Sequence, residues 1–166
     1  MGERFGVKCN KCEYKFGVNI GCGLLGLRFF EINERTGKPY YHGYISNQNI
    51  IADVDTLIRT AADVREDEDF YYSKNQWRGH GSAQYLCTTC GELHNEFYFR
   101  LVYSGGFYEP EYYCSKCSST LVLVELIKAD SGDISIKSKK KVSWKCPLCN
   151  NPELVIDYSA RVTLYD

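Results

Sequence analysis

Apolar and polar side chains alternate along several stretches of the chain, most of them after residue 90. Alternation with a period of two places every second side chain on one face, which is typical of a half-buried β-strand. Such a strand is predicted early in the chain by the spacing of Tyr14, Phe16, Val18 and Ile20. Another is predicted over residues 97–103, followed by a turn at 104–106 and a return strand over 108–113.

The last third of the chain continues this pattern. Residues 121–127 are apolar nearly throughout, as expected of a strand covered on both faces. The sequence Asp-Ser-Gly-Asp at 130–133 indicates a turn, after which residues 134–144 are expected to return as a strand. Alternation from Leu154 to Leu164 predicts a long final strand with one apolar face.

One stretch has a helical period instead. Its apolar residues are Ile50, Ile51, Val54, Leu57, Ile58, Ala61 and Ala62. They share one face of a helix that we predict from about Asn47 to Val64, with Ser46 as its N-cap. The predicted fold class is therefore α+β, mainly β, with one amphipathic helix packed on antiparallel strands.

An acidic stretch and an aromatic cluster follow this helix. We interpret residues 65–69 as a solvated helix end. Phe70, Tyr71, Tyr72 and Trp77 are interpreted as packing over a small core rather than as an exposed contact surface.

Eight of the nine cysteines form four Cys-x-x-Cys knuckles. The eight are Cys9, Cys12, Cys87, Cys90, Cys114, Cys117, Cys146 and Cys149. Two residues between cysteines let a tight turn direct both sulfurs at one ion, and two knuckles complete a tetrahedral shell of thiolates. Because a disulfide framework needs no such repeated spacing and favours an even cysteine count, we predict two four-cysteine sites that hold two Zn²⁺ ions.

The knuckles can be paired in three ways. Consecutive pairing joins Cys9/Cys12 with Cys87/Cys90, and Cys114/Cys117 with Cys146/Cys149. Nested pairing joins the two middle knuckles and the two outer ones, and crossed pairing is the third choice. Loop length discriminates weakly, because closure entropy grows only logarithmically. We favour consecutive pairing and leave the other two open.

A shell of four thiolates is closed, which is typical of a structural zinc site. Catalytic zinc keeps an open position, usually beside histidine or carboxylate ligands, and no such ligand set is evident in the sequence. We therefore expect no catalytic residues and no enzyme activity. The alternative metal is iron in rubredoxin-like sites, which would make the protein an electron carrier.

Cys22 stands apart from the knuckles, between two glycines. A nucleophilic cysteine needs a base, and His42, His80 and His94 are the only histidines in the sequence. Their positions show no triad pattern, so we interpret Cys22 as a small buried thiol.

The four knuckles with strands between them resemble the zinc-ribbon superfamily. More loosely, the chain resembles uncharacterised bacterial proteins in which an N-terminal Cys-x-x-Cys precedes a glycine-rich apolar turn. The matching positions are Cys9, Cys12, the turn at 21–26 and the later knuckles through the terminal strand, whereas residues 33–81 have no counterpart. The resemblance implies two zinc ribbons of antiparallel strands, and it implies a scaffold rather than one function, because the superfamily serves transcription, translation, enzyme subunits and adaptors.

Charge and hydropathy narrow the class of partner. Lysine and arginine number 20 against 21 aspartate and glutamate residues, so the net charge of −1 gives no overall attraction to nucleic acid or an anionic membrane. Residues 1–9 lack the apolar core of a signal peptide, and the apolar run at 16–30 is too short and too polar to span a bilayer. We expect a cytoplasmic protein without a membrane anchor, forming one zinc-stabilised domain over 1–166 or two parts, 1–86 and 87–166.

A basic stretch is the remaining candidate for binding. It comprises Lys137, Lys139, Lys140, Lys141 and Lys145, with Lys128 and Trp144 nearby. Together with Tyr98, Arg100, Tyr112 and Tyr113 it could contact RNA or single-stranded DNA, although lysines also protect an edge strand from aggregation. We predict a non-enzymatic protein that presents a rigid surface to a macromolecular partner, with protein favoured over nucleic acid because the net charge is not basic.

Overall fold

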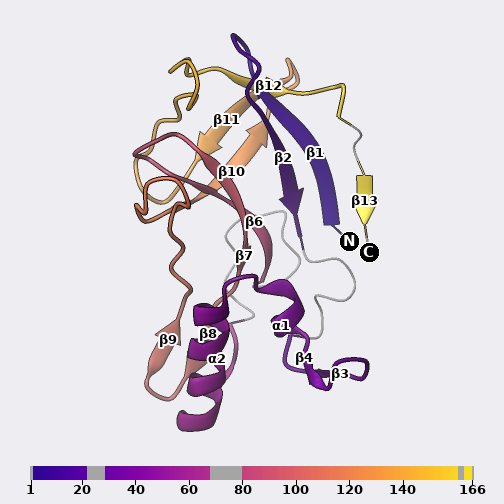
Figure 1. The fold of residues 1–166 in the computed structure, drawn as a ribbon, viewed down its shortest axis with the longest axis vertical. Helices are drawn as coiled ribbons and strands as arrows, with labels where there is room; N and C mark the ends of the chain where they lie inside the picture. Colours follow the sequence, from indigo (N-terminus) through magenta and orange to yellow (C-terminus); the bar gives the residue numbers. More distant parts are fainter. Residues whose placement is uncertain (1, 22–28, 68–79, 161–162, 166) are drawn as a thin grey trace.

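A computed structural model describes residues 2–21, 29–67, 80–160 and 163–165. It is mainly β, and eight strands form one antiparallel sheet in the order β13-β1-β12-β11-β10-β6-β7, with β2 paired to β1 (Figure 1). The strands are β1 (Gly2–Cys9), β2 (Lys15–Ile20), β6 (Gly81–Leu86), β7 (Leu93–Tyr98), β10 (Val122–Lys128), β11 (Asp133–Lys137), β12 (Leu154–Ile156) and β13 (Thr163–Tyr165). Strands β1, β2 and β6 come from residues 1–86 and the other five from residues 87–166, so both of these parts contribute to the same sheet.

The sheet curls until it nearly closes. At the end of β2, Gly21 and Ser82 of β6 exchange two backbone hydrogen bonds of 3.3 and 2.8 Å. Side-chain amides extend this seam, since Asn95 Nδ2 donates to the Gly17 carbonyl at 2.6 Å and Gln84 Nε2 donates to the Asn19 carbonyl. Amide side chains thus satisfy part of a strand edge that would otherwise lack partners.

Shorter elements lie at the opposite end of the molecule from the β1–β2 turn (Figure 1). They are β3 (Ile32–Asn33), β4 (Lys38–Pro39), α1 (Tyr41–Tyr44), α2 (Gln48–Thr60), β5 (Arg65–Glu66), β8 (Leu101–Tyr103) and β9 (Gly106–Tyr108). Strands β5, β8 and β9 form a separate antiparallel sheet.

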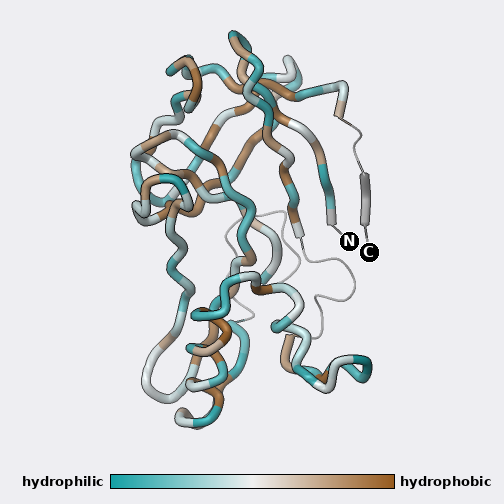
Figure 2. The backbone as a smooth tube through the Cα atoms, in the orientation of Figure 1, coloured by the Kyte–Doolittle hydropathy of each residue, from teal (hydrophilic) through white to brown (hydrophobic). Residues whose placement is uncertain are grey.

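The amphipathic helix is confirmed as α2, but it is shorter than predicted and begins one residue later. Its N-cap is Asn47, whose side chain accepts a hydrogen bond from the Asn49 N–H at 3.0 Å, so the prediction of Ser46 was wrong. Ile50, Ile51 and Val54 are buried, and the turns of α2 alternate between brown and teal in Figure 2. The burial of one face stabilises a helix that has little intrinsic stability of its own.

Two hydrophobic cores lie on opposite faces of β6. Ala83 and Tyr85 point into one core together with Val54 of α2 and Phe99. Leu86 points the other way, into a core formed between β1, β2, β10 and β11. Strand β6 is therefore covered on both faces, and each core also includes buried cysteines.

The hairpin β10–β11 is confirmed, with the turn at residues 130–133 as predicted, but its return strand ends at Lys137 rather than at residue 144. The predicted final strand is interrupted: β12 ends at Ile156, and the chain turns at Asp157, whose carboxylate accepts hydrogen bonds from the N–H and the hydroxyl of Ser159. The hairpin over 97–113 is also shorter than predicted, because only β8 and β9 pair, with Leu101 opposite Tyr108.

The architecture differs from the expected two zinc ribbons of antiparallel strands. The strands beside all four knuckles, except the short stretch before Cys114, belong to the same curled sheet. Strands β1 and β6, which no pattern singled out, supply its central pairings with β12 and β10.

Candidate metal centres

The eight knuckle cysteines come together in two groups of four. One group is Cys9, Cys12, Cys146 and Cys149, and the other is Cys87, Cys90, Cys114 and Cys117. The pairing is therefore nested, and the favoured consecutive pairing was wrong. Within each group all four sulfurs lie within 4.8 Å of one another, so the two groups could hold two metal ions.

Strand pairing explains the nested arrangement. The knuckle that follows β1 meets the knuckle that precedes β12, because β1 pairs with β12 and Cys9 lies opposite Leu154. In the same way β10 pairs with β6, with Val122 opposite Leu86, so the knuckles beside these residues converge. The order of strands in the sheet, which knuckle spacing does not encode, decides which thiols meet.

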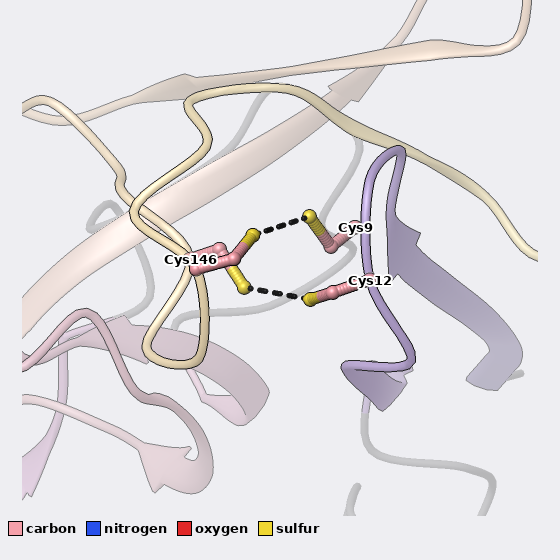
Figure 3. A group of neighbouring side chains, drawn as sticks. Cys9, Cys12 and Cys146 are labelled. Carbon is pink, nitrogen blue, oxygen red and sulfur yellow. Dashed lines mark hydrogen bonds between the residues drawn. The ribbon is translucent and has the colours of Figure 1, made fainter.

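The two groups repeat one geometry. In the first, Cys9 Sγ lies 3.6 Å from Cys149 Sγ and Cys12 Sγ lies 3.4 Å from Cys146 Sγ. In the second, the same distances are 3.4 Å for Cys87–Cys117 and 3.6 Å for Cys90–Cys114. Figure 3 shows Cys9 and Cys12 from the β1–β2 turn facing Cys146 across the first site. None of the eight is in a disulfide.

These distances fit a tetrahedral thiolate site. A Zn–S bond of about 2.3 Å in a regular tetrahedron separates neighbouring sulfurs by roughly 3.8 Å. Each group also has the same burial, with two buried cysteines, one half-buried and one exposed. In every knuckle the first cysteine is the buried one, and the second is half-buried or exposed.

Three of the four knuckles contain the same type of turn. The residue after the second cysteine donates its N–H to the carbonyl of the first, as in Gly91–Cys87 (2.8 Å), Ser118–Cys114 (2.8 Å) and Asn150–Cys146 (2.9 Å). All three donors have left-handed backbone, with φ of 77° at Gly91, 57° at Ser118 and 59° at Asn150. This reversal closes the turn beneath the two sulfurs.

At Gly91 the backbone also packs against the other site. A Cβ atom there would lie 2.1 Å from the Lys145 carbonyl oxygen, next to Cys146. Only glycine combines the left-handed φ with this close approach. Gly91 is therefore required at the point where the two centres meet.

Two aromatic side chains bridge the centres. Trp144 donates its indole N–H to the Gly91 carbonyl at 3.0 Å. The Leu93 N–H lies 3.4 Å from the hydroxyl oxygen of Tyr14, and the Tyr14 and Trp144 rings are 6.1 Å apart. Tyr14 and Trp144 flank cysteines of the first group, and Gly91 follows Cys90 of the second. These contacts therefore link the two centres directly.

The surroundings favour a thiolate at one cysteine of each group. Burial opposes ionisation of Cys9, but hydrogen bonds from the backbone N–H groups of Lys11 and Cys12 outweigh it and lower its pKa to about 6. Hydrogen bonds from Ser119 lower the pKa of Cys117 to about 6.

Other thiols resist ionisation. Burial, and then the neighbouring thiols, raise the pKa of Cys90 to about 12. At Cys12 the Tyr14 N–H lowers the pKa, but burial and the other thiols outweigh it and raise the value to about 12. Four crowded thiols need a compensating positive charge before all can ionise, and a bound divalent cation supplies that charge.

Two of the three histidines, which were considered only as bases for Cys22, lie away from the cysteine groups. His42 Nε2 is 3.2 Å from Asp55 Oδ1, beside the Tyr41 hydroxyl, where it joins α1 to α2. His80 is buried, with Nδ1 2.5 Å from Glu66 Oε2. Among the described residues, the only groups of side chains arranged to hold a metal ion are the two cysteine groups.

Glu66 and Asp67 of the acidic stretch are less exposed than predicted, whereas residues 68–69 lie outside the described residues. Besides the contact of Glu66 with His80, Asp67 lies 3.6 Å from Arg100. The helix ends earlier, at Thr60, so Glu66 belongs to the short strand β5 and Asp67 follows it, and neither lies at a solvated helix end. Cys22, the rest of the 22–26 turn and the Phe70–Trp77 cluster fall outside the described residues.

The predicted nucleic-acid surface is only partly present. Trp144, Tyr98 and Tyr112 are buried because they pack into the two cores. The Tyr98 hydroxyl donates to Glu109, which also pairs with Arg100 at 3.0 Å. Of the predicted aromatic contacts, Tyr113 alone is exposed. Lys137, Lys139 and Lys140 do lie together, but they line a groove that no sequence pattern locates.

Comparisons with known proteins add no relatives: no protein-family model, no curated protein and no solved structure matches this chain. No helix in the described ranges has both the length and the apolar character needed to cross a bilayer.

Proposed function

We propose that this protein is a non-enzymatic scaffold in which two structural zinc ions hold a curled β-sheet and present a rigid surface to a macromolecular partner. The observation that carries the proposal is the repeated four-thiol geometry of the two groups. Four thiolates fill a tetrahedral shell, and a filled shell leaves no position for substrate or water. Residues 1–166 then act as one zinc-stabilised domain.

Zinc is proposed over iron because the thiols lie on two cores and hold distant parts of the sheet together. The group containing Cys9 and Cys149 closes a loop of most of the chain length, which is a structural rather than an electron-transfer task. Absorption of the purified protein tests this choice: a colourless chain with zinc supports the proposal, and a red chain containing iron contradicts it.

A protein partner is proposed over nucleic acid. The net charge is −1, and the aromatic side chains that would stack on bases are mostly buried. Stacking platforms need exposed ring faces beside a basic channel. The likeness to zinc ribbons supports the scaffold role but does not select a partner.

Affinity capture with the tagged, zinc-loaded chain tests the class of partner. The experiment compares extracts with and without nuclease treatment. The control is a chain with Cys12→Ser and Cys149→Ser, in which the first centre is disrupted. Specific protein partners that persist after nuclease treatment and are lost with the control support the proposal. Capture that disappears on nuclease treatment, or that is equal with the control, contradicts it.

A further inference from the structure

A groove of about 570 Å³ lies along β10 and is separate from both cysteine groups. One wall is formed by β9, which contains Phe107, and by the chain that leaves it toward β10 in Figure 1, which contains Glu109. The other wall runs from Lys137, the last residue of β11, to Lys140 in the segment that follows. A volume of this size is in the range of pockets that bury a ligand.

The floor of the groove is an incomplete strand edge. Strand β11 pairs with β10 only from Glu125 to Lys128, so residues 122–124 have no strand on that side. In place of a strand, the Ser138 hydroxyl donates to the Leu123 carbonyl at 2.8 Å, and the Leu121 N–H donates to the Tyr112 carbonyl at 2.8 Å. An extended chain that displaced these two contacts would complete the edge, as in peptide recognition by strand addition.

The groove is apolar inside. Tyr85 and Tyr112 pack edge to face with their ring centroids 5.1 Å apart, and Leu123 is only half-buried. At its mouth the Phe107 side chain is 59% exposed, although the Arg100 guanidinium lies over its ring at 4.6 Å. An apolar ligand side chain would remove both Leu123 and Phe107 from water.

The charges of the two walls are not equivalent. Glu109 on one wall is already paired with Arg100 at 3.0 Å, and Glu111 accepts a hydrogen bond from the Tyr113 hydroxyl at 3.0 Å. On the other wall, Lys137 and Lys140 are exposed, and no carboxylate within the described residues forms an ion pair with either. The positive wall therefore has charge available for a ligand.

We propose that this groove binds an extended peptide segment of a partner protein, with an apolar side chain over Leu123 and Phe107 and acidic side chains against Lys137 and Lys140. The proposal rests on the proposed scaffold function and names its contact surface. A nucleic-acid strand fits less well, because three aromatic side chains that line the groove, Tyr85, Tyr98 and Tyr112, are buried and cannot stack on bases.

Fluorescence anisotropy with the full zinc-loaded chain tests the proposal. The probes are a short labelled peptide with a Leu-Phe-Leu centre and glutamate flanks, the same peptide with lysine flanks, and labelled oligouridine. Saturable binding of the acidic peptide, at least about tenfold tighter than that of the basic one, is expected. Equal affinity for the two peptides, tighter binding of oligouridine, or no saturable binding would overturn the proposal.

Matched variants locate the binding site. Lys137→Glu with Lys140→Glu should weaken binding of the acidic peptide about tenfold, whereas Arg35→Glu with Lys38→Glu makes the same charge change at exposed positions near β4 and should not. Phe107→Ser should weaken binding, whereas Ile32→Ser, at a side chain that is 57% exposed, should leave it unchanged. Equal effects of the paired variants would contradict the groove as the site.

The two proposals can fail separately. If affinity capture finds nuclease-resistant protein partners whose binding is unaffected by the groove variants, the scaffold function stands and the groove proposal falls. If capture depends on nucleic acid, the proposed protein scaffold falls as well.

Discussion

Individual residues just after the cysteines shape each metal centre. Gly91, Ser118 and Asn150 occupy the same position in three knuckles and share a left-handed backbone. Asparagine and glycine tolerate this conformation better than most residues, so their place after Cys149 and Cys90 is a signal that sequence reading could have used.

Gly91→Ala should be more damaging than an ordinary glycine substitution. A Cβ at Gly91 would meet the Lys145 carbonyl oxygen at 2.1 Å and would also strain the left-handed backbone. We expect a loss of about 3 kcal/mol in the free energy of unfolding of the zinc-loaded chain, measured by urea denaturation.

Gly37→Ala is the matched control for this substitution. Gly37 also has positive φ, of 67°, but a Cβ added there would have no neighbour within 4 Å. It should lose about 1 kcal/mol, the backbone strain alone. Equal losses for the two variants would show that the contact with Lys145 has no special cost.

Among the elements, helix α2 has two neighbouring candidates for its N-cap, Ser46 and Asn47, and substitution of each distinguishes them. Asn47→Ala removes the side chain that accepts from the Asn49 N–H and should destabilise the protein by about 1 kcal/mol. Ser46→Ala should change stability by less than about 0.5 kcal/mol, because Ser46 is exposed and lies outside the cap. Thermal or urea unfolding of both variants checks the assignment, and a larger loss for Ser46→Ala would reverse it.

Because Trp144 links the first centre to Gly91 beside the second, we predict that the two centres bind metal cooperatively. Disabling the first centre with Cys12→Ser and Cys149→Ser should weaken metal binding at the second by about fivefold, because Trp144 no longer holds Gly91 in place. Affinity is measured by competition between cobalt-loaded protein and a chelator.

Trp144→Phe provides the control for this coupling. It keeps an aromatic ring beside Tyr14 but removes the indole N–H that donates to Gly91. In this background, disabling the first centre should affect the second much less, as a double-mutant cycle would show. An unchanged effect would mean that the contact does not transmit metal binding.

Elements with strong local patterns could be predicted, and those defined by distant partners could not. Helix α2 and hairpin β10–β11 have a clear period and a clear turn signal. Strand β1 was missed although Phe5, Val7 and Cys9 are buried at alternate positions, because Gly2 and Gly6 and the charged residues between them weaken the pattern. Nested pairing depends on β1 meeting β12, which no local pattern specifies.

At the scale of the whole molecule, the cysteines were predictable but their setting was not. Cysteine spacing alone identified all eight thiols that form the two groups in the structure, because a Cys-x-x-Cys knuckle is defined by residues close together in the sequence. The single curled sheet, the seam of side-chain amides at Gln84 and Asn95, and the groove along β10 depend on contacts between distant parts of the chain. Apolar periodicity does not encode such contacts.

The position of the cysteine groups beside the two cores explains why bound metal should control stability. Each hydrophobic core includes the two buried cysteines of one group. Cys9 and Cys146 pack in one core, and Cys87 and Cys114 pack in the other. Removing the ions would leave crowded thiols at the edge of both cores and release the contacts between the knuckles. Metal binding then contributes directly to the free energy of folding.

Elemental analysis combined with circular dichroism, before and after chelation, tests this account most directly. We predict two zinc ions per folded chain, matching the two four-cysteine groups, and loss of the native near-ultraviolet spectrum when a chelator removes them. A folded chain with well under two equivalents of metal, or a metal-free chain that keeps its native spectrum, would contradict it.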